Sequence, residues 1–528
     1  MQKLVARSLA TLMFAGAMID PGPAGAQSAT TTPIKHLVVI FQENVSFDHY
    51  FGTYPHALNP SGEPRFVAAP GTPSVNGFTD ALLHNNPNAL NHDNGSGASN
   101  PFRLGRSQAE TADMDHDYIA EQRAFHGGLM DLFPKYTGTP GPPPAGHKTR
   151  GLVMGYYDGN TVTAFWNYAQ RFAMSDNSHG TNFGPSTVGA INLISGQTNG
   201  VIDQINAHSD LVPDGGGGYT VIASPDPIGD VCSSTTVAQV KFGGTNVGDL
   251  LNSSGISWGF FAGGFDLATK NPNGTTGCRR SHKSAITGAG DVDYQAHHEP
   301  FQFYTSTQNL KHTRPSSPRT IGMAGDPANH QYDIQDFYDA LDAGNFPAVS
   351  FLKAPSYEDG HAGYSNPLDE QIFVVTVINL LQQQKDWEST AVVIAYDDSD
   401  GWYDHQMGPI VNQSASDKDA LTGPGECGKG ENTLPGVSAP HAQGRCGYGP
   451  RLPLMVISPY AKRNYVDHEI SDQSSILRFI EDNWLDGQRI PGSFDVLAGQ
   501  LDSMFDFNND GDDSTYLLNP STGEVTTQ

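Results

Sequence analysis

The sequence predicts an α/β protein with a largely parallel central sheet flanked by helices. Short apolar runs rich in β-branched residues, typical of buried strands, alternate with segments whose apolar residues recur every three or four positions, as on a helix. Polar residues directly follow each apolar run. Strands that alternate with helices form parallel sheets, and such sheets bind ligands beyond the carboxyl ends of their strands.

The first 26 residues have the features of a secretory signal peptide. Lys3 and Arg7 supply positive charge, residues 9–18 are apolar, and Ala24-Gly25-Ala26 resembles a cleavage site. No later apolar run approaches the ~20 residues that a membrane-spanning helix needs. We expect a secreted or periplasmic mature chain that begins near Gln27 and has no transmembrane segment. An uncleaved anchor is the alternative.

Four apolar runs are the predicted strands. They span residues 34–41, 348–352, 391–396 and 454–457. Helical periodicity covers residues 369–384 and 473–484. Two Gly-, Asn- and Pro-rich segments, around residues 55–113 and 209–287, are expected as long insertions or a cap over the sheet. Residues 27–528 are thus expected to form a single large catalytic domain.

The four cysteines are expected to form two structural disulfides. Four thiols allow three pairings. Cys232–Cys278 with Cys427–Cys446 is favoured because each bond closes a local loop. None of the spacings is CxxC, so neither a zinc site nor a redox dithiol is expected.

Composition limits the partners of the protein. The chain of 528 residues has 29 Lys and Arg against 56 Asp and Glu, which gives a formal net charge of −27. Affinity for the phosphate backbone of nucleic acids requires a basic surface, so nucleic-acid binding is not expected. A metal could still neutralise an anionic site inside this acidic chain.

Carboxylates follow two of the predicted strands. Glu43 and Asn44 come after the first, and Asp397 and Asp398 come after a later one. Oxygen ligands that converge from separate strand ends can hold a hard divalent cation. A single carboxylate of this kind is more often a helix cap or a solvated turn. Two such clusters together favour a metal site.

A candidate nucleophile lies in the segment FGPSTVG, where Ser186 follows Gly184-Pro185. A helix is expected from about Ala190, and a hydroxyl at its start would face the positive end of the helix dipole, which stabilises an alkoxide and a bound phosphate. The alternative is that Ser186 or Thr187 only caps this helix. The absence here of a G-x-S-x-G elbow disfavours a Ser-His-Asp esterase.

Histidines are the other candidate catalytic residues. They are His116 in DMDHDY, His297 and His298 in HHEPFQFY, His361 in EDGHAGY and His405 in YDH. A lone histidine is more often structural. Histidines can also donate to phosphate oxygens or protonate a leaving group near pH ~6.

The string ENVSFDHYFGTYP at residues 43–55 resembles the N-terminal signature of the bacterial phosphoesterase family, within the alkaline-phosphatase superfamily. That family includes secreted acid phosphatases and phospholipases C. FGPSTVGAINLISG resembles its nucleophile segment, and further family blocks follow in order: HHEPFQFY, DGHAGYS, YDDSDGWYDH, RLPLMVISPYA and SSILRFIEDNW. The similarity extends from about Ile34 to Leu485. It implies an alkaline-phosphatase-like α/β fold and metal-assisted hydrolysis of phosphoric esters.

The resemblance also assigns roles to single residues. It implies one divalent metal ion held by Glu43, Asn44, Asp397, Asp398 and Ser186, with Ser186 also the nucleophile that forms a phosphoseryl intermediate. It implies that four histidines hold the phosphoryl oxygens or protonate the leaving group, namely His116, His297, His298 and His361. Oxygen ligands permit Mg, Ca or Mn, and the resemblance does not decide between them.

Departures from the family pattern favour its acid-phosphatase branch. Val45 replaces a common Arg, Asp398 stands where many phospholipases have Glu, and Ser186 stands where they have Thr. The chain also ends soon after Trp484, where those phospholipases often continue into β domains. We therefore expect a phosphomonoesterase with an acidic optimum, because histidines that grip phosphate must be cationic. A phospholipase C or another phosphodiesterase, acting on a phospholipid headgroup or a small diester, is the alternative. A non-catalytic exported binding protein is the distant one.

Overall fold

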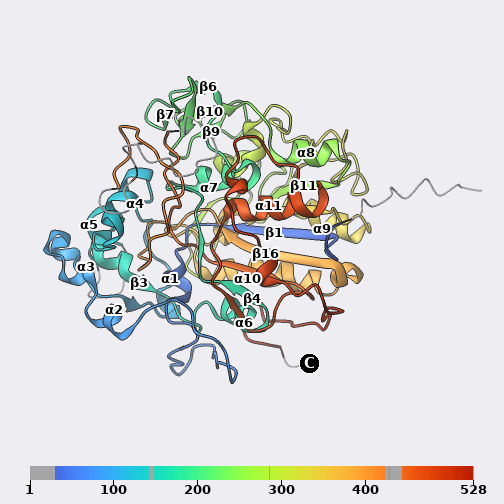
Figure 1. The fold of residues 1–528 in the computed structure, drawn as a ribbon. Coiled ribbons are helices and arrows are strands. Elements are labelled where there is room, and N and C mark those ends of the chain that lie inside the picture. Colours follow the sequence, from blue (N-terminus) through green and yellow to red (C-terminus); the bar gives the residue numbers. More distant parts are fainter. Residues whose placement is uncertain (1–29, 142–147, 285, 422–426, 428–442, 527–528) are drawn as a thin grey trace, which may run out of the picture.

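The computed structural model describes residues 30–141, 148–284, 286–421, 427 and 443–526. The predicted signal peptide, residues 1–26, lies outside the described residues. The chain is organised around an eight-stranded sheet with helices on both faces (Figure 1). The α/β class predicted from the sequence is confirmed.

Seven of the eight strands run in the same direction, and only β17 is antiparallel to both of its neighbours, β16 and β4. The prediction of a largely parallel sheet is therefore confirmed. In spatial order the strands are β14 (Gln331–Asp333), β11 (Trp258–Ala262), β15 (Val349–Lys353), β1 (His36–Gln42), β16 (Thr390–Tyr396), β17 (Leu454–Ile457), β4 (Ala173–Ser175) and β18 (Tyr465–Asp467).

The four predicted strands are β1, β15, β16 and β17, each within two residues of its expected bounds. The direction of β17 changes one expectation. Because β17 is antiparallel, its carboxyl end and Ser458 lie at the edge of the sheet opposite to the carboxyl ends of β1 and β16. The polar residues after β17 therefore do not join those after β1 and β16.

The long helices pack on the two faces of the sheet. α7 (Ser186–Ser195) packs against α11 (Gln473–Trp484), whereas α6 (Thr163–Arg171) packs against α10 (Pro367–Leu381) on the other side (Figure 1). The two helices predicted from periodicity are α10 and α11. The Asn366 side chain caps α10 and the Asp472 side chain caps α11, so both helices begin at a sequence-encoded N-cap.

The remaining elements are short and border this framework. The helices are α1 (Phe47–Phe51), α2 (Asp80–His84), α3 (Pro87–Leu90), α4 (Tyr118–Phe125), α5 (Phe133–Tyr136), α8 (Val247–Ser253) and α9 (Ile334–Asp342). The strands outside the central sheet are β2 (Phe102–Arg103), β3 (Gly155–Tyr156), β5 (Ser178–His179), β6 (Val201–Ile205), β7 (Leu211–Pro213), β8 (Tyr219–Val221), β9 (Asp226–Pro227), β10 (Gln239–Phe242), β12 (Ser281–Lys283), β13 (Gly290–Val292) and β19 (Ser471–Asp472).

The Gly-rich segment 209–287 was expected to be an insertion along its whole length, and this expectation is wrong for one part of it. It contributes β11 to the central sheet, between β14 and β15. The aromatic run WGFFA of β11 is fully buried, and its flanks of Gly, Asn and Ser obscured it in the sequence. Among the described residues, no helix combines the length and apolar character needed to cross a bilayer.

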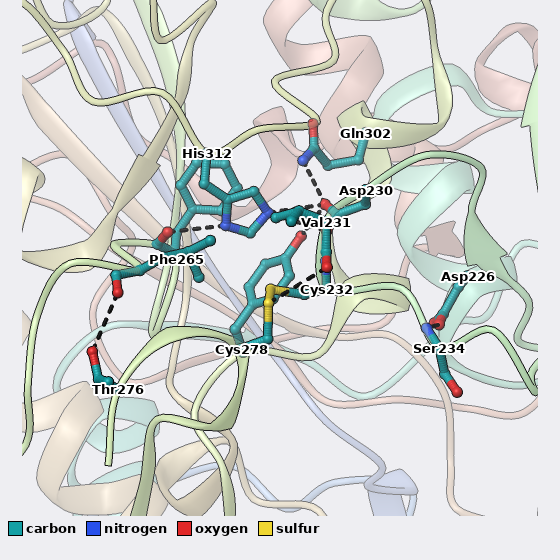
Figure 2. Close-up of a disulfide and its surroundings, with 12 residues drawn as sticks. Asp226, Asp230, Val231, Cys232, Ser234, Phe265, Thr276, Cys278, Gln302 and His312 are labelled. Atoms are coloured by element: carbon teal, nitrogen blue, oxygen red, sulfur yellow. Dashed lines mark hydrogen bonds and ion pairs between the residues drawn. A yellow bond between two sulfur atoms is a disulfide. The ribbon is translucent and has the colours of Figure 1, made fainter. Parts of the chain in front are cut away.

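Both expected disulfides, Cys232–Cys278 and Cys427–Cys446, are present. Figure 2 shows the first beside a buried polar cluster. His312 Nε2 lies 3.1 Å from both carboxylate oxygens of Asp230, and Gln302 donates to the same carboxylate at 2.6 Å. The disulfide therefore joins the segment around residue 278 to a well-anchored segment around Asp230.

Candidate active site

Two neighbouring strand ends bring the predicted metal ligands together. β1 and β16 are parallel, and Gln42 pairs with Tyr396, so Glu43 and Asn44 emerge beside Asp397 and Asp398. The Asn44 backbone lies in the left-handed region at φ 60°, which Asn tolerates better than most residues. Its N–H donates to Asp397 Oδ1 at 3.0 Å.

Ser186 reaches the same place from α7. It is the first residue of this helix, and its Oγ donates to Asp398 Oδ2 at 3.2 Å. The N-cap is Pro185, so neither Ser186 nor Thr187 caps the helix, and the capping interpretation is wrong. Gly189 allows the close approach, because a Cβ there would overlap the carbonyl oxygen of Asp397.

Three acceptor oxygens of the predicted ligand set are buried without a partner in the described part of the chain. Glu43 Oε2, Asn44 Oδ1 and Asp397 Oδ2 are buried and have no hydrogen-bond partner among the described residues. Buried acceptors of this kind are normally satisfied, and a divalent cation would satisfy them as oxygen ligands.

The raised pKa values of the two aspartates also favour a cation site. Burial, followed by the Glu43 carboxylate, raises the pKa of Asp397 to about 8. Burial also raises the pKa of Asp398 to about 7, although His116 acts in the opposite direction. A bound cation would stabilise the charged forms of both side chains.

His116 and His361 lie beside Asn44 and Asp400. His116 Nε2 is 3.5 Å from Asn44 Nδ2, and the rings of His116 and His361 are 6.0 Å apart. Burial lowers the pKa of His116, but the carboxylates of Asp398 and Asp400 outweigh it and leave that pKa well above its ordinary value. Burial lowers the pKa of His361 to about 4. The two histidines therefore differ in charge near neutral pH.

His297 and His298 belong to the short 3-10 turn Ala296–His298, which lies beside Glu43. His298 Nδ1 is 3.3 Å from Glu43 Oε1, and burial lowers the pKa of His298 well below its ordinary value. The His297 ring is 4.3 Å from the His298 ring, and its Nδ1 is 3.6 Å from Asp226 Oδ1. The expectation that the histidines are uniformly cationic thus fits His116 but not His298 or His361.

Several charged residues of the site were missed from the sequence. Lys353, the last residue of β15, forms a buried ion pair with Glu43. Burial acts to lower the pKa of Lys353, but the Glu43 carboxylate stabilises the charged ammonium and raises that pKa above its ordinary value. β15 is parallel to β1, so the strand-end criterion that found Glu43 also applies to Lys353. Asp359 places a carboxylate oxygen within 4.8 Å of ligand atoms of Glu43 and His298, and Asp400 does the same for His116 and His361.

A buried ion network holds the segment that follows Asn44. Arg451 precedes β17, and its guanidinium contacts Asp48 of α1 at 2.9 Å and Asp404 at 3.1 Å. His405 Nδ1 lies 2.6 Å from the other oxygen of Asp48. Through these contacts α1 is fixed against the loop that contains Asp397 and Asp398. His405 therefore lies in the anchor of this loop, not among the candidate ligands.

Comparison with known proteins gives one family. The model of the Phosphoesterase family matches residues 34–485. A non-hemolytic phospholipase C of Burkholderia pseudomallei is 24% identical over 502 residues, which cover 92% of this chain and 61% of that protein. Phospholipase C A of Mycobacterium tuberculosis is 23% identical over 509 residues, covering 92% and 79%. The chain spans about three fifths of the length of the first of these relatives.

Solved structures resemble the chain only distantly. The crystal structure of wild-type alkaline phosphatase PafA has 12% identity and a TM-score of 0.30, and the alignment covers 65% of this chain and 94% of PafA. A protein of the alkaline phosphatase superfamily from Vibrio parahaemolyticus has 11% identity and a TM-score of 0.25, with 78% and 76% covered.

Proposed function

Because the chain belongs to the Phosphoesterase family, we propose that it is a metal-dependent phosphoric ester hydrolase with Ser186 as its nucleophile. The observation that carries this proposal is the contact between Ser186 Oγ and Asp398, beside the unpartnered oxygens of Glu43, Asn44 and Asp397. A hydroxyl nucleophile next to a set of buried acceptor oxygens is suited to attack on a phosphorus atom.

The roles of the side chains follow from their contacts. Ser186 Oγ forms the new bond to phosphorus, and its proton passes to the Asp398 carboxylate at 3.2 Å. His116 has a raised pKa and gives its proton to the leaving oxygen as the ester bond breaks. A water molecule then attacks the phosphoseryl group and returns a proton to His116. Phosphate leaves, and Ser186 recovers its own proton from Asp398.

A divalent cation, with Mg, Ca or Mn as candidates, would be held by Glu43, Asn44, Asp397, Asp398 and Ser186. When bound, it supplies positive charge that favours the serine alkoxide and polarises a phosphoryl oxygen. The neutral imidazoles of His298 and His361 can donate hydrogen bonds to the remaining phosphoryl oxygens, with His297 beside them.

We propose phosphomonoesters as the preferred substrates, with an optimum on the acid side of neutrality. The support for monoesters is the number of histidine donors in the site, which matches a terminal phosphoryl group with three free oxygens. The raised pKa of His116 keeps this general acid protonated throughout the acidic range. The second candidate is phospholipase C activity, which is favoured by the names of the relatives. We further propose export from the cytoplasm, because disulfides persist in oxidising compartments.

One comparison tests this proposal. Purified protein is assayed on an aryl phosphomonoester, the corresponding aryl phosphodiester and phosphatidylcholine, each at several pH values and with Ser186→Ala as the control. We expect the monoester to be hydrolysed fastest, below pH ~7. Faster turnover of phosphatidylcholine than of both aryl esters would support the phospholipase C instead. No turnover of any of them in metal-loaded enzyme would overturn the hydrolase proposal.

A further inference from the structure

Two separate segments must stay in register for Ser186 to meet Asp398. The first is the turn Gly184-Pro185 that leads into α7, and the second is the loop Asp397–Asp400 that follows β16. The direct contact is the 3.2 Å hydrogen bond from Ser186 Oγ to Asp398. This contact is used in the reaction itself, since the Oγ must leave it to attack phosphorus, so it cannot alone keep the segments aligned.

Glu121 of α4 joins these two segments. Its carboxylate accepts from Ser399 Oγ at 2.7 Å through Oε1, and from the Gly184 N–H at 3.2 Å through Oε2. Ser399 directly follows Asp398, and Gly184 is two residues before Ser186. Ser399 Oγ also accepts from the Gly401 N–H at 3.0 Å, so its hydroxyl is held on both sides. One side chain therefore bridges the segments beside their reacting residues.

The position of Glu121 is unusual for a carboxylate. Its side chain is 1% exposed, and neither of its two partners is a cation. Buried carboxylates without a cation partner are costly, and an apolar residue of similar size would fill such a space at lower cost. The Gly184 backbone is also specialised, because its φ of 123° is open to glycine alone. This conformation directs the Gly184 N–H to Glu121.

We propose that Glu121 is a positioning residue that fixes the Ser186 turn against the Asp398 loop for attack on phosphorus. This inference rests on the proposed role of Ser186 as the nucleophile. The hydrogen bonds of Glu121 go to Gly184 and Ser399, and not to Ser186 Oγ or Asp398, so it acts through these two neighbours. Small displacements of a reacting group, of about 1 Å, can lower turnover by about 100-fold.

The test compares three variants. Glu121→Ala removes both hydrogen bonds, and Glu121→Gln can keep both, because its amide oxygen accepts from Gly184 and its amide NH₂ donates to Ser399 Oγ. The matched control is Gln122→Ala. Gln122 is the next residue of α4 and is fully buried. Its side-chain oxygen accepts from the backbone N–H groups of Ala420 and Leu421, so it bonds to neither the Ser186 turn nor the Asp398 loop.

For the hydrolysis of an aryl phosphate, Glu121→Ala should lower kcat by roughly 30- to 100-fold with KM changed less than about threefold. Glu121→Gln should restore kcat to within about fivefold of the wild type, and Gln122→Ala should leave it within about twofold. If Glu121→Ala keeps its kcat, or if Gln122→Ala loses as much, the positioning role is wrong.

Hydrogen–deuterium exchange gives a readout that does not depend on activity. The peptide that contains Gly184 to Ser186 should exchange faster in Glu121→Ala than in the wild type, and at the wild-type rate in Glu121→Gln. Equal exchange in all variants would overturn the positioning role of Glu121, whether or not the wild type is active. An inactive wild type would instead count against the proposed function. Should Glu121→Ala fail to fold, Ser399→Ala removes one hydroxyl only, and an unchanged kcat there would be equally damaging.

Discussion

Replacement of Ser186 by Ala tests the centre of the proposed chemistry. The substitution removes the Oγ that lies 3.2 Å from Asp398 and changes nothing else at the start of α7, because Ser186 is not the helix cap. Loss of a covalent nucleophile lowers kcat by about 10⁴-fold or more, equivalent to about 5 kcal/mol of barrier. Ser186→Thr keeps a hydroxyl at this position and should retain measurable turnover.

Thr187 provides the matched control for this prediction. It is the next residue of α7 and is also fully buried, but its Oγ1 donates to the His297 carbonyl oxygen at 3.4 Å and does not contact the ligand set. This bond is long, so Thr187→Ala should cost about 1 kcal/mol of stability. Its kcat should stay within about threefold of the wild type, since the Ser186 Oγ remains in place.

The assay measures steady-state turnover of an aryl phosphate by all three variants, together with acid-quench trapping of phosphoprotein. The wild type and Ser186→Thr should yield labelled protein, and Ser186→Ala should yield none. Labelled protein from Ser186→Ala, or an inactive but folded Thr187→Ala, would refute the assignment of the nucleophile.

Three further predictions concern the metal, the crosslinks and pH. Asp397→Asn keeps the oxygen that binds the Asn44 N–H but replaces the unpartnered one, so calorimetry should show divalent-metal affinity lowered by about 100-fold or more; unchanged affinity would exclude Asp397 as a ligand. Opening the Cys232–Cys278 disulfide by a double Cys→Ser change should lower the free energy of unfolding in urea by about 4 kcal/mol for a sequence separation of 46, and a loss under about 1 kcal/mol would contradict this. Burial lowers the pKa of His405, but Asp48 outweighs it and raises that pKa above its ordinary value. The contribution of the His405–Asp48 pair to the free energy of unfolding is therefore complete below pH ~6.5 and is lost as pH rises through the folded pKa. In urea unfolding at several pH values, His405→Gln should lack this loss of stability.

The strand ends account for most of what could be predicted of the site. β1 and β16 are continuous apolar runs, and their parallel pairing places Glu43 and Asn44 beside Asp397 and Asp398. A residue that directly follows such a run can thus be assigned to an edge of the sheet from the amino-acid sequence alone. Lys353 was accessible to the same argument, because it ends a strand that was predicted.

Contacts made by helices and loops could not be predicted in this way. Glu121 lies on a short helix with no strand-end signal, and its partner Ser399 is 278 residues away in the sequence. The aromatic strand β11 was hidden for a different reason, since the composition of its flanks is that of a loop. Long-range side-chain contacts and strands without clear boundaries require the tertiary structure, whereas periodicity and strand ends do not.

The reversed direction of β17 determines where the protein can vary. Because β17 is antiparallel to β16, the connection between them leaves the sheet at Asp397 and re-enters it after Arg451 at the same edge. Both of its ends are fixed, by the ligand set and by the Arg451 network. The entropic cost of closing a loop grows slowly, by about 0.6 kcal/mol per doubling of length. The connection can therefore change in length at little cost while Asp397, Asp398 and Arg451 at its two ends keep their places.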